Sequence, residues 1–235
     1  MVGQLSTAVY IDGYNLYYGR IRGTAYKWLD VVALFRALLN QQQPAATLDL
    51  VHYFTAPALG RFATHGARAP ESQNSYHRAL QAANPHNFLL TLGSHAFDRE
   101  GTLLPRYQAG RAYDRNDRVR VWKIEEKQTD VNLALAMYRG ACSGRYQQLV
   151  VCSNDSDVAP VLGAIKADFP AIRLGVVTPR HPPRDGVRPH RAVSSSLDQF
   201  SDWTRQYLLD AELEVAQLPD RVATGRKPIR KPDYW

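Results

Sequence analysis

Four aspartates occupy positions where a carboxylate could do chemistry. Asp12 closes the run Tyr-Ile-Asp, and Asp155 and Asp157 follow the apolar segment 149–153. Asp130 comes shortly after a segment that ends in two glutamates. Carboxylates that share one cleft repel one another unless protons or a cation neutralise them. A set of oxygen ligands favours Mg²⁺ or Mn²⁺ over zinc, so these residues predict a site for one of those two ions.

A divalent cation held by carboxylates suits the hydrolysis of phosphodiester bonds, because the metal lowers the pKa of the attacking water. A second metal could stabilise the leaving oxygen. Asp157 also has a structural explanation. Pro160 belongs in the first turn of a helix, which predicts an N-cap at about Asp157 or slightly later. Asp155, two residues earlier, is explained either by a turn or by metal binding.

Alternating strand and helix patterns surround these aspartates. Strands are expected at 6–11, 48–54, 88–92, 118–124, 149–153 and 172–177, and helices at 29–39, 72–83, 130–138 and 158–167. In the third helix, Val131, Leu135 and Tyr138 can share one face. This alternation predicts an α/β fold with a mostly parallel central sheet and helices on both faces. Ligands in that architecture collect beyond the carboxyl ends of the strands.

The 235 residues, 45% of them hydrophobic, predict one domain over residues 1–210 and a basic, proline-containing tail over 211–235. No apolar run reaches the roughly 18 residues that a membrane span needs, and residues 1–7 lack the pattern of a signal peptide. Cytoplasmic localisation is therefore expected. The two cysteines, Cys142 and Cys152, are too few for a disulfide framework and lack the spacing of a zinc site.

The formal net charge of +7 makes polyanions such as RNA plausible partners, because clustered cations release counterions from phosphates. The segment 178–191 reads TPRHPPRDGVRPHR, and its Arg180, Arg184 and Arg188 could bind an RNA backbone. A plain solvated loop is the alternative.

Three tyrosines follow Asp12 closely, at positions 14, 17 and 18. They could stack on nucleic-acid bases, or they could face the core from a short helix. The sequence pattern favours the core.

Three motifs occur in order along the chain: Tyr-Ile-Asp-Gly-Tyr-Asn-Leu at 10–16, Glu-Glu-Lys-Gln-Thr-Asp-Val-Asn-Leu-Ala at 125–134 and Ser-Asn-Asp-Ser-Asp at 153–157. Together they resemble the NYN domain family, a branch of the PIN-like nuclease superfamily, over roughly residues 6–178. The resemblance implies a three-layer α/β/α sandwich and a metal-dependent endoribonuclease that cleaves single-stranded or structured RNA. It assigns catalytic and metal-binding roles to Asp12, Asp130, Asp155 and Asp157.

The resemblance also implies supporting residues. Asn15 would hold the Asp12 loop or a metal-bound water, although an Asn that merely stabilises the turn fits as well. Ser153 could donate a hydrogen bond to a neighbouring carboxylate, and Lys127 could contact a phosphate or lie free on the surface. Asn154 stands where the family often has glycine, and Val158 where it often has phenylalanine. Neither departure alters the acidic set.

A catalytically silent RNA-binding or regulatory module is the main alternative, with the acids capping helices or binding a structural cation. A phosphatase of the haloacid-dehalogenase type fits less well, because Tyr14 stands where that motif needs a second aspartate. The preference for RNA over DNA, the number of metals and the formation of a homodimer are left open.

Overall fold

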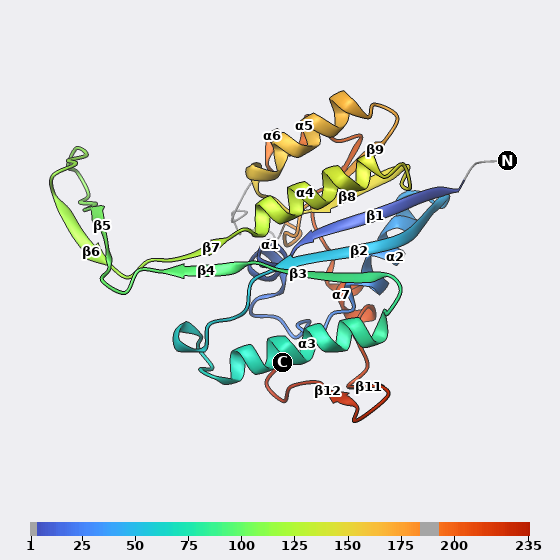
Figure 1. Ribbon diagram of the computed structural model, residues 1–235, viewed down its shortest axis with the longest axis horizontal. Helices are drawn as coiled ribbons and strands as arrows, with labels where there is room; N and C mark the ends of the chain where they lie inside the picture. Colours follow the sequence, from blue (N-terminus) through green and yellow to red (C-terminus); the bar gives the residue numbers. More distant parts are fainter. Residues whose placement is uncertain (1–3, 184–192) are drawn as a thin grey trace.

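The computed structural model describes residues 4–183 and 193–235. A six-stranded sheet forms its centre, in the order β10-β9-β8-β1-β2-β3 (Figure 1). The strands are β1 (Leu5–Asp12), β2 (Ala46–Thr55), β3 (Phe88–Leu92), β8 (Gln148–Cys152), β9 (Arg173–Val177) and β10 (Trp203–Arg205). Every neighbouring pair in this sheet runs parallel. The predicted α/β class with a mostly parallel sheet is confirmed.

Helices cover both faces of the sheet. One face carries α4 (Thr129–Cys142), α5 (Ala159–Asp168) and α6 (Ser195–Asp198), and the other carries α2 (Val31–Gln42), α3 (Arg68–Ala83) and α7 (Asp210–Val215). Side chains of β1 alternate between the two layers, as the pleat requires: Val9 and Ile11 pack toward α2, whereas Ala8 and Tyr10 pack toward α4. The result is the expected three-layer sandwich.

The remaining elements are short. Helical turns occur at α1 (Gly13–Leu16), η1 (Tyr17–Ile21), η2 (Gly60–Phe62) and η3 (Ser156–Val158), and short strands at β4 (Ser94–Phe97), β5 (Thr102–Pro105), β6 (Arg118–Val121), β7 (Ile124–Lys127), β11 (Arg221–Val222) and β12 (Ile229–Arg230). The turn η1 is a π-helix. Such turns are rare in proteins, and many of those that occur lie at functional sites.

The strand expected at 118–124 is two strands, and neither belongs to the central sheet. β7 pairs with β4 and β6 pairs with β5, both antiparallel, and the two ribbons form an arm that projects from the end of β3 (Figure 1). Most side chains of β5 and β6 are exposed, so their apolar residues do not mark a buried strand.

The face of α4 that the pattern selected points to solvent. Val131 is 62% exposed and Leu135 is 51% exposed, while Leu133 and Met137 are fully buried against the sheet. The helix lies especially close to β1 at Gly140, where an added Cβ would come within 2.0 Å of the Tyr10 hydroxyl. This close approach sets the buried face, and hydrophobicity alone did not reveal it.

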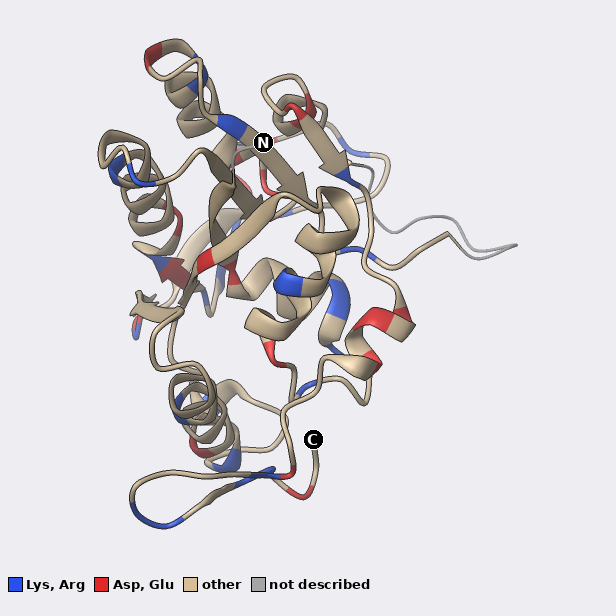
Figure 2. Cartoon of the chain, turned by 90° about the vertical axis from the view of Figure 1, so that its right-hand side faces the viewer, with Lys and Arg blue, Asp and Glu red and all other residues tan. Residues whose placement is uncertain are grey.

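Residues 211–235 pack against the rest of the molecule. Leu213, Leu218 and Ile229 belong to the core on the α2 side of the sheet, and the Trp235 ring lies 6.1 Å from that of Trp28. None of the described helices is both long enough and apolar enough to cross a membrane. Lys and Arg are spread over several helices and loops in the view of Figure 2.

Candidate functional site

Asp12 lies at the carboxyl end of β1 and is only 4% exposed. Its carboxylate caps α1 by accepting a hydrogen bond of 2.9 Å from the Asn15 amide, and it accepts another of 3.0 Å from the Ser153 hydroxyl. Burial raises the pKa of Asp12 to about 6. The negative charge of Asp130 also raises this pKa, whereas the hydrogen bond from Asn15 lowers it. Part of the population is therefore protonated near neutral pH.

Asn15 and Ser153 join the loops that follow β1 and β8. The Asn15 side-chain oxygen accepts a hydrogen bond of 3.1 Å from the Asn154 amide, and the Ser153 hydroxyl accepts one of 3.0 Å from the Asp155 amide. The predicted hydrogen bond from Ser153 to a neighbouring carboxylate is confirmed, and Asn15 holds the Asp12 loop. The two strand ends are thus fixed relative to each other.

Asp155 and Asp157 follow β8 as expected, and the structure shows which of the two caps a helical turn. The helix α5 has its N-cap at Val158 with Pro160 in its first turn, as the proline indicated. The capping carboxylate is that of Asp155, which accepts a hydrogen bond of 3.1 Å from the Asp157 amide and begins η3. Asp157 itself is exposed. It lies within η3, directly before the N-cap residue of α5.

Asp130 is exposed in the first turn of α4, and its pKa is raised by partial burial and by the charges of Asp155 and Asp157. Glu126, at the end of β7, was not among the predicted site residues. Burial raises the pKa of Glu126 to about 7, opposed by a hydrogen bond from Thr129 and reinforced by the Asp12 charge. Asp12, Glu126, Asp130 and Asp155 therefore converge on one edge of the sheet, and we call these four residues the acid cluster.

The chain enters α4 through a strained residue. Gln128 has a φ of 76°, the one positive φ among the described non-glycine residues. Strain of this kind is tolerated where the surrounding structure fixes the backbone, and it is frequent at functional sites. The preceding Lys127 is exposed, and its ammonium lies 2.7 Å from the Glu125 carboxylate. Contact of Lys127 with a phosphate stays a prediction.

The described residues contain no group of three or more His, Cys, Asp or Glu side chains arranged to hold a metal ion. The acids nevertheless raise one another's pKa, so they share an electrostatic environment that a cation would relieve. Oxygen ligands of this kind still fit Mg²⁺ or Mn²⁺ best. The predicted cofactor stays a prediction, with Asp12, Asp130, Asp155 and Asp157 as its expected ligands.

If these acids bind Mn²⁺, the ion at ten times its Kd should stabilise the wild-type protein by roughly 1.4 kcal/mol. Asp130→Asn removes one expected ligand at an exposed position and should abolish most of this stabilisation. Thermal unfolding with Mn²⁺ or with a chelator measures the difference. Asp220→Asn, at an exposed aspartate outside the cluster, is the matched control. Equal stabilisation of all three proteins would rule out the predicted site.

An aromatic cavity of about 480 Å³ borders the acids. Aromatic side chains from widely separated elements line it: Tyr14, Tyr17, Tyr18, Tyr53, Tyr76 and Trp235. The cavity and the acid cluster meet at Gly13 and Tyr14, which directly follow Asp12. The Tyr14 hydroxyl lies 3.1 Å from a ring nitrogen of His95. The sequence did not reveal the cavity, because its walls come from opposite ends of the chain.

Tyr17 is 38% exposed and Tyr18 is 57% exposed, so the prediction that these two face the core is wrong. The π-helical turn η1 displays both rings toward the cavity instead.

The basic segment is only partly described. Arg180 is half-buried just after β9, and its carbonyl accepts a hydrogen bond of 3.1 Å from the Leu208 amide. Arg184 and Arg188 lie outside the described residues. Binding of RNA by these arginines stays a prediction, as does formation of a homodimer.

No protein-family model matches the chain, so the NYN resemblance stays a prediction. A solved structure of a protein of unknown function from Vibrio parahaemolyticus is similar with a TM-score of 0.48 and 14% sequence identity, over 89% of this chain and 96% of that one. A likeness this weak supports no functional argument.

A curated relative gives a different answer. The 6-hydroxy-3-succinoylpyridine 3-monooxygenase HspA of Pseudomonas putida is 36% identical over 244 residues, which span 98% of this chain and 75% of the relative. That relative is named as a monooxygenase, and monooxygenases are oxidoreductases. The predicted metal-dependent endoribonuclease activity is therefore wrong, as is the assignment to the hydrolases, and the alternative of a silent RNA-binding module gains no support. The chain belongs to the family of this monooxygenase.

Proposed function

We propose that the protein is a monooxygenase that hydroxylates a hydroxypyridine bearing an acidic acyl side chain. The observation that carries this proposal is the 36% identity to the 6-hydroxy-3-succinoylpyridine 3-monooxygenase over 98% of the chain. A likeness that spans nearly the whole chain includes both the acid cluster and the aromatic cavity. An aromatic ring is also the kind of ligand that a cavity walled by tyrosines accommodates.

A monooxygenase divides dioxygen between two products. One oxygen atom is inserted into a bond between a ring carbon and its substituent, and the other leaves as water after taking up two electrons and two protons. The electrons must come from a two-electron reductant, and a bound cofactor usually carries such chemistry. The protein's part is to bind and orient the ring and to move protons.

Glu126 is suited to a proton transfer. Its pKa of about 7 lets it accept a proton near neutral pH, which is the condition for an efficient general base. It lies close enough to Tyr14, in the cavity wall, for its charge to raise the pKa of that tyrosine. We assign to Glu126 the removal of the proton from the ring hydroxyl, which makes the ring more electron-rich and more reactive toward an oxidant.

The proposal is tested with 6-hydroxy-3-succinoylpyridine, ¹⁸O-labelled dioxygen and a panel of two-electron reductants that includes NADH and reduced flavin. The expected result is consumption of dioxygen and a hydroxylated product with one labelled oxygen atom, detected by mass spectrometry. Label in water alone would indicate uncoupled reduction of dioxygen. No labelled product with any reductant, from protein that is folded and binds the pyridine, would contradict the proposal.

We also propose that the enzyme works in the cytoplasm. Cys152 is buried and Cys142 is exposed, and both are free thiols. Free cysteines are common in proteins of reducing compartments.

A further inference from the structure

The aromatic cavity has the size and the position of a small-molecule site. Its volume of about 480 Å³ lies in the usual range for such sites, roughly 300–1,000 Å³. It opens beyond the carboxyl ends of β1 and β2, where ligands of parallel α/β proteins collect. Gly13 follows the first of these strands and Thr55 ends the second, and both belong to the lining.

The charges around the cavity select for an anion. Arg22 and Lys27 belong to its lining, and no Asp or Glu side chain does among the residues that the structure describes. Lys27 is half-buried, and neither cation forms an ion pair within residues 4–183 and 193–235. A cation that has no partner within the protein is available to pair with a ligand. An anionic ligand would supply the missing partner.

The aromatic rings at the cavity are arranged to accept a further ring. Tyr18 lies between two other tyrosines, with ring centroids 5.7 Å from Tyr14 and 5.1 Å from Tyr17. The Arg22 guanidinium covers the Tyr18 ring at 5.5 Å. Rings that are exposed in the free protein, as Tyr17 and Tyr18 are, gain most from stacking when a planar ligand removes them from water.

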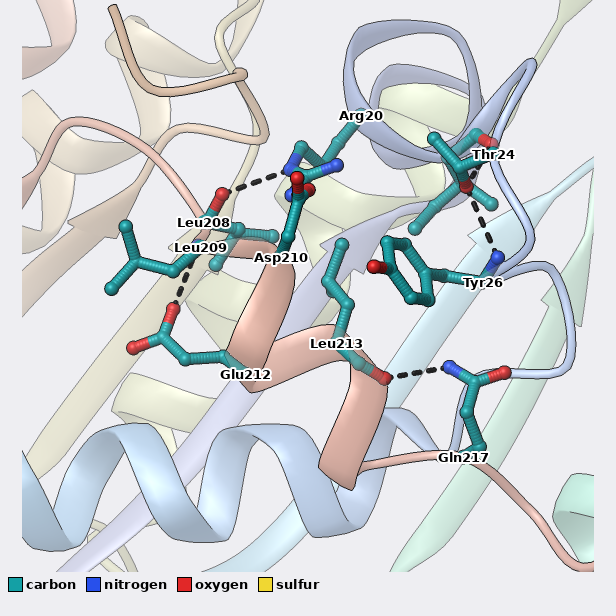
Figure 3. A network of polar contacts seen from close by, with 10 residues as sticks. Arg20, Thr24, Tyr26, Leu208, Leu209, Asp210, Glu212, Leu213 and Gln217 are labelled. Carbon is teal, nitrogen blue, oxygen red and sulfur yellow. Dashed lines mark hydrogen bonds and ion pairs between the residues drawn. The ribbon is translucent and has the colours of Figure 1, made fainter.

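The turn that carries these tyrosines is anchored to the body of the protein. Arg20, near the end of η1, is fully buried, and its Nε donates a hydrogen bond of 2.9 Å to the Leu208 carbonyl (Figure 3). One of its terminal nitrogens pairs with the Asp210 carboxylate. The position of Tyr17 and Tyr18 is therefore fixed before any ligand binds, which lowers the entropic cost of binding.

We propose that this cavity binds a planar aromatic ring that bears a carboxylate side chain, with Tyr18 stacking on the ring and Lys27 pairing with the carboxylate. The inference rests on the proposed function for the identity of the ring, a hydroxypyridine. The proposed binding site is distinct from the acid cluster, because the negative charges of that cluster would repel the carboxylate of the ligand. The ring would meet that cluster only at the Tyr14 end of the cavity.

The test measures binding without reductant, so that it does not depend on turnover. The probe is 6-hydroxy-3-succinoylpyridine, and the neutral analogue carries an acetyl group in place of the succinoyl group. Calorimetry gives the two dissociation constants, and quenching of tryptophan fluorescence, to which Trp235 in the cavity wall contributes, provides a second readout. Lys27→Gln should weaken binding of the acid about tenfold and leave the neutral analogue unchanged, because only the acid has a charge to lose.

The role of Tyr18 is tested with the same two ligands. Tyr18→Ala should weaken both ligands about tenfold, whereas Tyr18→Phe keeps the stacking surface and should bind like the wild type. Arg36→Gln, at an exposed arginine of α2 outside the cavity, is the control for net charge. Thermal unfolding confirms that each variant is folded.

The outcomes separate the two proposals. Binding that depends on Lys27 and Tyr18, with no oxygenated product under any reductant, supports the cavity and contradicts the proposed function. Turnover with an unchanged KM in both variants supports the function and overturns the cavity. Equal loss of the acid and the neutral analogue in Lys27→Gln would overturn the pairing with the carboxylate.

Discussion

Asp12→Asn is expected to raise the free energy of unfolding by about 2 kcal/mol at pH 8 and to lose that advantage by pH 4. The ionised carboxylate of Asp12 is nearly fully buried, and burial raises its pKa to about 6. Asparagine is almost the same shape but never carries the charge. Its side-chain oxygen can still accept the hydrogen bond from the Asn15 amide.

The direction of the pH dependence follows from the raised pKa. Below the unfolded-state pKa of about 3.9, Asp12 is protonated in both states, so it does not penalise folding. Between there and pH 6 the unfolded chain loses its proton first, and the folded state becomes less stable as the pH rises. A shift of about two pKa units corresponds to roughly 3 kcal/mol. The hydrogen bond that the Ser153 hydroxyl donates to the Asp12 carboxylate is weakened in the variant, because asparagine has one side-chain oxygen instead of two. This loss offsets about 1 kcal/mol of the gain.

Urea denaturation of both proteins at pH 4, 6 and 8, with a chelator present, gives the difference directly. Glu126 and Asp130 titrate in both proteins, so subtraction removes their contribution to a first approximation. Asp220→Asn, at an exposed aspartate, should show no such trend. A difference between Asp12→Asn and wild type that is equal at pH 4 and pH 8 would show that the carboxylate is not destabilised. A buried carboxylate that lowers the stability of the fold, as we expect of Asp12, is a candidate for a functional residue, because active sites often trade stability for activity.

The strands of the sheet were predictable because β1 and β8 are apolar runs that end at polar turns. Parallel strands buried on both faces leave that signal. The arm left no such signal: β5 and β6 expose both faces and pair only with each other. β10, with three residues, is too short to give a periodic pattern. Buried strands can be predicted from the local sequence pattern, whereas pairing between exposed strands cannot.

The acid cluster was largely predictable and the cavity was not. Asp12 and Asp155 lie at strand ends, and strand ends of a parallel sheet meet at one edge. Glu126 could have been found from its place shortly before Asp130, since the end of β7 and the start of α4 lie at the same edge. The cavity joins Tyr14 to Trp235 across almost the whole chain, and no local pattern reports that contact. The chemistry suggested by the acids alone pointed to the wrong reaction.

Asp210→Ala is expected to lower the free energy of unfolding by about 3 kcal/mol, because it leaves the buried Arg20 guanidinium without its counter-ion. The Arg20 side chain has no exposed surface, whereas the Asp210 side chain is half exposed. One terminal nitrogen of Arg20, Nη1, has no hydrogen-bond partner among the described residues, so the Asp210 carboxylate already carries most of the compensation (Figure 3). Removing it leaves one hydrogen bond, to the Leu208 carbonyl.

A double-mutant cycle separates this pair from the helix end that Asp210 occupies. Asp210 lies in the first turn of α7, where an acidic side chain alone contributes about 0.3–1 kcal/mol. In an Arg20→Met background, where a neutral side chain fills the site, Asp210→Ala should cost about 2 kcal/mol less than in the wild type, and this difference is the coupling energy of the pair. Urea denaturation of the four proteins gives this value, and additive effects would show that the pair does not hold η1. Since η1 carries Tyr17 and Tyr18, Asp210→Ala should also weaken binding of the pyridine acid, although Asp210 is not part of the cavity lining.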